Sequence, residues 1–148
     1  MTIYRLHVVA DDVAEVVGNA AGLIVDHVMA GWRVTVELAG GEGIRPLEIL
    51  GADVVDGITD FADDRWMLAI GADSYARAGG IDELLARCTD VLVWGTAPQA
   101  QETYRHRLSS AGRAFKAAAL GAAGITDVDV VETEVFASRV AGHVSLRA

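Results

Sequence analysis

Two patterns of hydrophobic and polar positions alternate along this chain, and each pattern predicts one kind of secondary-structure element. Apolar residues that alternate with polar ones, or that run continuously, predict β-strands. Such strands are expected at 3–10, 33–39, 53–58, 66–70, 91–94 and 128–136, with a return strand at 140–146 as a further option. Apolar residues that recur three and four positions apart predict helices. Helices are expected from Val13 to Gly31, over 46–50, over 73–85 with a break at Gly79 and Gly80, and over 99–123.

Strands that alternate with helices along a chain are typical of an α/β fold. Right-handed crossovers between parallel strands place such helices on both faces of the sheet. The pattern therefore predicts one domain over 1–148, a three-layer sandwich around a mostly parallel sheet of five to six strands. We expect this domain to be flavodoxin-like or Rossmann-like, with a C-terminal antiparallel edge strand or hairpin as a possible addition.

Composition narrows the class of protein. Of the 148 residues, 52% are hydrophobic and 22% are charged, which is typical of a globular domain. No run reaches the roughly 18 consecutive apolar residues that a membrane span needs. The first residues lack the pattern of a secretion signal, so we expect a cytoplasmic protein. Arginine outnumbers lysine eleven to one, which indicates a bacterial chain with GC-rich coding bias.

In folds of this kind, ligands bind where parallel strands reach their carboxyl ends. The sequence places polar and hydroxyl side chains directly after the expected strands, so we expect a small-molecule site there, with an unidentified cofactor or ligand. Asp12 can equally act as the N-cap of the first helix, with Glu15 three residues later completing the capping signature. The candidate ligand-binding residues are Asp11, Asp12, Arg45, Ser74, Thr96 and Gln99.

The segment from His7 to Glu37 resembles the start of receiver domains of bacterial signalling, with the acidic pair Asp11 and Asp12 after the first strand. The resemblance covers about a third of the chain. It implies a magnesium site at the acidic pair and a phosphoacceptor at Asp56. The chain departs from the pattern at Gly57 and Thr59, and Gly95-Thr96-Ala97-Pro98 replaces the lysine expected after the fifth strand. These departures favour a domain that binds without being phosphorylated.

Charge is distributed unevenly. The chain carries a formal charge of −9, which argues against wrapping of duplex nucleic acid and against anionic membrane surfaces. Residues 104–116 carry four basic residues and no acid, so this segment is +4 and the remainder is −9 − 4 = −13. If 104–116 is helical, the residues Arg105, Ser109, Arg113 and Lys116 form a stripe for an anion or an acidic partner, such as a second copy of the chain. The alternative is a solvated helix face.

Sequence templates of catalysis are absent from the chain: it has no Gly-x-Ser-x-Gly elbow, no paired-histidine metal motif and no second cysteine beside Cys88. We therefore expect no catalytic residues and no metal site. The first hypothesis is a non-catalytic binding or regulatory domain that acts as a homo-oligomer. The alternative is a small-molecule-binding protein or small enzyme with its site at the carboxyl ends of the strands. A third possibility is a partner for a basic protein.

Overall fold

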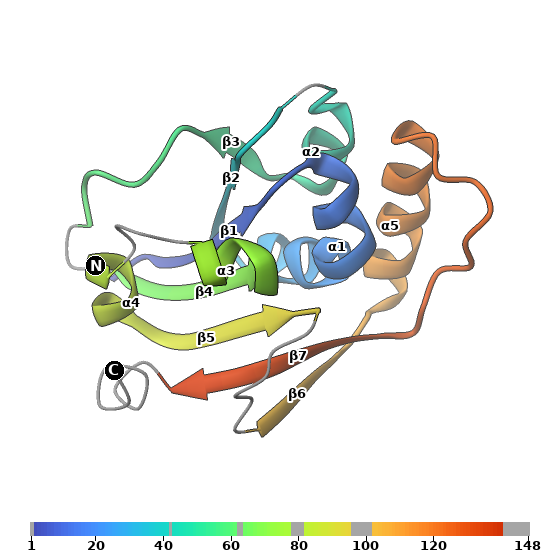
Figure 1. The fold of residues 1–148 in the computed structure, drawn as a ribbon. Coiled ribbons are helices and arrows are strands. Elements are labelled where there is room, and N and C mark those ends of the chain that lie inside the picture. The colour runs from blue at the N-terminus through green and yellow to red at the C-terminus, as the bar shows by residue number, and fades with distance from the viewer. Residues whose placement is uncertain (1, 42, 62–63, 78–81, 96–101, 141–148) are drawn as a thin grey trace.

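The computed structural model describes residues 2–41, 43–61, 64–77, 82–95 and 102–140, which form seven strands and five helices (Figure 1). The strands are β1 (Tyr4–Ala10), β2 (Arg33–Leu38), β3 (Asp53–Val55), β4 (Arg65–Gly71), β5 (Cys88–Trp94), β6 (Glu102–Arg107) and β7 (Thr133–Val140). The helices are α1 (Val13–Met29), α2 (Arg45–Leu50), α3 (Ala72–Arg77), α4 (Asp82–Arg87) and α5 (Ser110–Ala122).

All seven strands form one sheet in the order β3-β2-β1-β4-β5-β7-β6. Strands β1 to β5 are parallel to one another, whereas β7 is antiparallel to both β5 and β6. The prediction of a mostly parallel sheet is confirmed, but the described residues contribute seven strands to it instead of five to six. The antiparallel C-terminal strand is also confirmed, although it lies inside the sheet, because β6 takes the edge position beside it.

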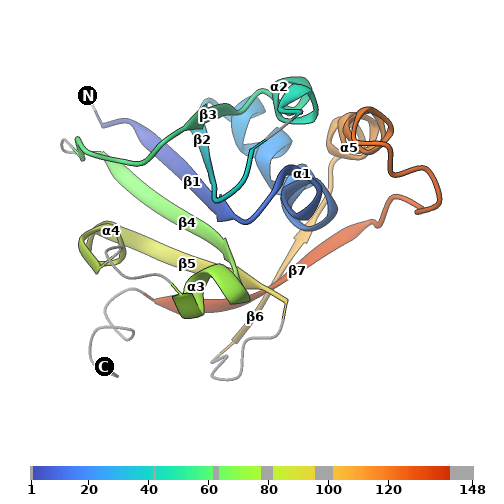
Figure 2. The ribbon, with the colours of Figure 1, turned by 45° about the horizontal axis from the view of Figure 1, so that its top comes forward.

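Helices cover both faces of the sheet, as the right-handed crossover rule predicts. Figure 2 shows α1, α2 and α5 together on one face, with α3 and α4 on the other. The three-layer α/β arrangement expected from the sequence is therefore present. Among the described residues, no helix combines the length and apolar character that crossing a membrane requires.

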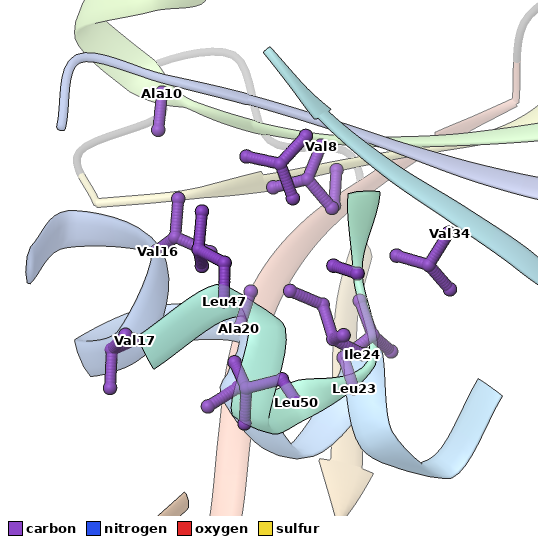
Figure 3. Packing of buried hydrophobic residues seen from close by; sticks show 14 of the residues in the cluster. Val8, Ala10, Val16, Val17, Ala20, Leu23, Ile24, Val34, Leu47 and Leu50 are labelled. Atoms are coloured by element: carbon purple, nitrogen blue, oxygen red, sulfur yellow. The ribbon is translucent and has the colours of Figure 1, made fainter. Parts of the chain in front are cut away.

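The larger core cluster lies between the sheet and the layer of α1, α2 and α5 (Figure 3). Alternate residues of β1 point into it, so Leu6, Val8 and Ala10 are at most 1% exposed. Facing them, α1 supplies a buried stripe that includes Val16 and Ile24 at helical spacing. Burial of an aliphatic side chain of this size contributes about 1.5–3 kcal/mol to stability. The periodicity that predicted each element therefore reflects one shared core.

The smaller core cluster lies on the opposite face, where α4 packs on β4 and β5. The continuous apolar runs predicted these central strands correctly, because both faces of a strand between two helical layers are buried. In β4, every residue from Trp66 to Gly71 is buried. The expected strand at 91–94 begins three residues earlier, at Cys88, so Cys88 opens a strand and does not lie late in a helix.

The helix expected over 99–123 is wrong in its first part. Residues 102–107 form strand β6, and the helix begins only at Ser110. The side chains of Tyr104 and His106 are half-buried while Arg105 and Arg107 are exposed, which is the period of a strand. Ser109 stops the strand pattern because its hydroxyl caps α5 by accepting from Gly112 N, at 2.9 Å. The option of a strand at 140–146 falls almost entirely outside the described residues.

Candidate functional site

The polar group that best fits a ligand site lies at the carboxyl ends of β1 and β4. Asp11 is the first residue after β1, and Ser74 and Arg77 lie on α3, which follows β4 directly. Ser74 Oγ donates a long hydrogen bond of 3.4 Å to Asp11 Oδ1, and the Arg77 guanidinium forms an ion pair with the same oxygen. The Arg77 and Asp11 side chains remain 61% and 39% exposed, so a ligand in solvent can reach both charges.

Glu15, in the first turn of α1, lies next to this group and contacts Asp11. Its Oε1 accepts the backbone N–H of Asp11 at 2.9 Å, and its Oε2 accepts Trp94 Nε1 at 3.0 Å. A Cβ atom at Gly71 would lie 2.1 Å from Oε2, so the carboxylate occupies space that only a glycine leaves free. Glu15 thus ties the end of β1 to the end of β5, across the end of β4.

Asp12 is the N-cap of α1, as the sequence predicted. Its Oδ1 accepts the backbone N–H of Glu15 at 2.9 Å. A carboxylate at this position satisfies a free N–H group and opposes the positive end of the helix dipole. Because Glu15 bonds to Asp11 N instead of Asp12 N, the capping box is shifted by one residue from its usual form.

The structure brings together only part of the predicted ligand-binding set. Asp11 and Ser74 meet, with Asp12 beside them but turned to the helix. Arg45 is the exposed first residue of α2, and no interaction found among the described residues joins it to Asp11 or Ser74. Thr96 and Gln99 lie outside the described residues. Arg77 and the contact of Glu15 with Asp11 were not predicted from the sequence, since neither residue directly follows a strand.

The acidic constellation that the receiver resemblance implies is not assembled. Asp56 follows β3, which is an edge strand two positions away from β1 and therefore from Asp11. The Asp11 carboxylate is paired with Arg77, and that of Asp12 caps α1. Within the described ranges, no group of three or more His, Cys, Asp or Glu residues could hold a metal ion.

A second polar group lies on the sheet itself. His7 is completely buried, with Nδ1 2.7 Å from Thr35 Oγ1 and Nε2 3.0 Å from Glu37 Oε1. A carboxylate, an imidazole and a hydroxyl in this order resemble an activated nucleophile. However, Thr35 lies within β2 and is paired with both β1 and β3, so its backbone is committed to the sheet. The geometry favours a structural link between β1 and β2, which the sequence signalled only by a histidine on the polar side of a strand.

A third polar group joins the end of α1 to the start of α5. Asp26 Oδ2 accepts His106 Nε2 at 2.7 Å and the backbone N–H of Ser109 at 3.1 Å, and Oδ1 accepts the Ser109 hydroxyl. Burial alone would raise the pKa of Asp26, but the hydrogen bonds from Ser109 and His106 outweigh it and hold the pKa below its usual value. Burial lowers the pKa of the neighbouring His27.

The Asp26→Asn variant tests this carboxylate through its pH dependence. Because the folded chain holds the Asp26 pKa below 3.8, the stability it contributes is present above that pH and is lost as the pH falls further. We expect Asp26→Asn to lower the free energy of unfolding by about 1–3 kcal/mol at pH 7, the worth of hydrogen bonds to a charged group. The loss should shrink as the pH falls below about 4. Urea unfolding of both proteins across this pH range measures it, and a pH-independent loss would contradict the assignment.

The expected cationic stripe does not exist as a single helix face. Arg105 lies on β6, Ser109 caps α5, and Arg113 is half-buried on α5. Lys116 is only 2% exposed, and its Nζ lies 2.8 Å from Glu134 Oε2. The prediction of a stripe from helical spacing is wrong because Arg105 belongs to a strand and because Lys116 points into the protein.

Cys88 is a buried, unreactive thiol. Burial, with a smaller contribution from the charge of Asp90, raises its pKa to about 12. A thiol with this pKa holds almost no thiolate at neutral pH, so it is a poor nucleophile. Cys88 acts as a small apolar residue of the smaller core cluster.

No family model matches this chain, and no curated protein matches its sequence at a significant level.

Proposed function

We propose that this chain is a non-catalytic, small-molecule-binding domain of the Rossmann-like type, with its site at the carboxyl ends of β1 and β4. Support for the type comes from the strand order. The segment β3-β2-β1-β4-β5 has the neighbours of the Rossmann order 3-2-1-4-5, whereas flavodoxin-like sheets have the order 2-1-3-4-5. The order reverses between β1 and β4, and ligands of such sheets bind outside the strand ends at this reversal.

The observation that carries the proposal is the meeting of Asp11, Ser74 and Arg77 at this reversal. These residues come from two separate segments, after β1 and after β4, and they present an acceptor, a hydroxyl and a cationic donor to one place. A few converging polar groups at a strand-end crevice are typical of ligand sites. Support for binding over catalysis is that Asp11 is held by a cation, which does not favour a general base.

The experiment is a thermal-shift screen of metabolites, followed by native mass spectrometry of each protein–ligand mixture. We expect a ligand that Asp11→Asn binds at least about tenfold more weakly, a loss of about 1.4 kcal/mol. The matched control is Asp73→Asn, which removes an exposed carboxylate from α3 outside the group. Ligands that bind both variants equally well would place the site elsewhere and overturn the proposal.

Self-association is a second candidate property, supported by the edge strand β6. Its outer side has no strand partner among the described residues, and an edge strand of this kind can pair with another copy. Val135 of the adjacent β7 is 53% exposed, which adds apolar surface near this edge. A dimer in native mass spectrometry supports a regulatory homo-oligomer, and a monodisperse monomer at high concentration contradicts it.

A further inference from the structure

The chemical class of the ligand can be inferred from the charges at the proposed site, and this inference rests on the proposed function. The Asp11–Arg77 ion pair is the accessible part of the group, since its side chains are 39% and 61% exposed. Exposed ion pairs contribute little to stability, because water screens the two charges. A ligand can therefore separate the two side chains at little cost, provided that it offers each of them a new partner.

A phosphate group does not suit this site. Helix N-termini often bind phosphate through free N–H groups. Here the Asp12 carboxylate already uses one of these donors, because it accepts Glu15 N, and the Glu15 carboxylate accepts Asp11 N just before the helix. Three carboxylates and one guanidinium then surround the site, so an added dianion meets net repulsion. The β1–α1 turn also lacks the glycines that let a pyrophosphate approach the backbone.

A ligand with a cation at one end and a carboxylate close to it matches the site better. An ammonium group pairs with Asp11, and a carboxylate pairs with Arg77, whose planar guanidinium suits two parallel hydrogen bonds. Ser74 is 9% exposed and already directs its hydroxyl at Asp11 Oδ1, so it stands beside the ammonium position. Such a ligand replaces one exposed ion pair with two and adds no net charge.

We propose that the site between β1 and β4 binds a zwitterionic α-amino acid, with its ammonium on Asp11 and its carboxylate on Arg77.

The test uses the common free α-amino acids as probes in isothermal titration calorimetry with the full chain. For the amino acid that binds best, the methyl ester removes the negative charge and the N-acetyl derivative removes the positive one. We expect each derivative to bind at least about tenfold more weakly than the free amino acid. Arg77→Gln should abolish the preference over the methyl ester, and Asp11→Asn should abolish the preference over the N-acetyl derivative.

Arg87→Gln is the matched control, because Arg87 is an exposed arginine on α4 that pairs with Glu83 away from the site. It should leave every binding constant unchanged. Should a site variant not fold, the two derivatives test the proposal on the unaltered protein. Equal affinity for free amino acid and both derivatives would overturn the inference, as would no amino-acid binding.

The metabolite screen of the proposed function and this titration together separate the inference from the proposed function. If a metabolite without zwitterionic character binds in a manner that depends on Asp11, the amino-acid class is wrong and the ligand site stands. If every binding event found is insensitive to Asp11→Asn, both the site and the class are wrong.

Discussion

Replacing Lys116 with methionine is expected to lower the free energy of unfolding by about 3–5 kcal/mol, the usual cost of leaving a buried charge without its partner. Native domains have only about 5–15 kcal/mol in total, so this change should come close to unfolding the protein. The reason is that Glu134, 3% exposed, would keep its charge inside the protein with no cation beside it.

The Lys116–Glu134 pair also forms hydrogen bonds with backbone groups of α1. Glu134 Oε2 and Oε1 accept the backbone N–H groups of Gly22 and Leu23 at 2.9 and 2.8 Å, and Lys116 Nζ donates to the carbonyl oxygen of Gly18 at 3.1 Å. Two side chains from β7 and α5 therefore hold the middle of α1 from outside the helix. Loss of the ammonium removes the donor to Gly18 as well as the partner of Glu134.

A double-mutant cycle read by urea unfolding checks this prediction. The double variant Lys116→Met with Glu134→Met should lose less stability than Lys116→Met alone, because it leaves no buried charge behind. Arg87→Met is the control, since it breaks an exposed pair and should change stability by no more than about 1 kcal/mol. A loss of under about 1 kcal/mol for Lys116→Met would show that the pair does not have this role.

Alanine at Gly22 should destabilise the protein by about 1–3 kcal/mol through overpacking, although alanine is the better helix former. Its Cβ would lie 2.2 Å from Leu108 Cγ, and Leu108 is only 2% exposed and cannot move outward. At Gly18, one turn earlier on α1, nothing lies within 4 Å of an added Cβ. Gly18→Ala should therefore stabilise the protein by about 0.5–1 kcal/mol.

Thermal or urea unfolding of these two variants gives opposite signs if the contact with Leu108 decides the outcome. Shortening Leu108 to alanine should make Gly22→Ala less costly in that background, because the clashing atoms are gone. If Gly22→Ala stabilises the protein as Gly18→Ala does, Leu108 does not lie close enough to Gly22 to clash with an added Cβ.

The sequence predicted the parts of the fold that depend on one segment at a time. The run from Trp66 to Ile70 and the alternation in 33–39 mark strands because burial of one or both faces leaves a direct pattern. The segment 102–107 was mistaken for helix because Tyr104 and Leu108 also fit a helical spacing. Only its pairing with β7, which no local pattern contains, makes it a strand.

The candidate site likewise contains residues that the sequence predicted and residues that it did not. Asp11 and Ser74 were predicted because any residue that directly follows a parallel strand reaches the same edge of the sheet. Arg77 was not predicted, because its approach to Asp11 depends on how α3 leaves β4. The Lys116–Glu134 pair was not predicted for a similar reason. Sequence spacing alone does not distinguish a buried lysine from an exposed one, and the partner carboxylate comes from a distant segment of the chain.

The hydrogen bonds from Gly22 and Leu23 to Glu134 also constrain when the protein can finish folding during its synthesis. They join groups 112 and 111 residues apart along the chain. A nascent chain on the ribosome carries the first helix long before the strand that holds it has been synthesised. Contacts of such long range slow folding, because a long loop must close before they form. The first half of this protein therefore has to remain free of aggregation until the last strand emerges, and a chain truncated before residue 134 lacks the carboxylate that accepts from the middle of its first helix.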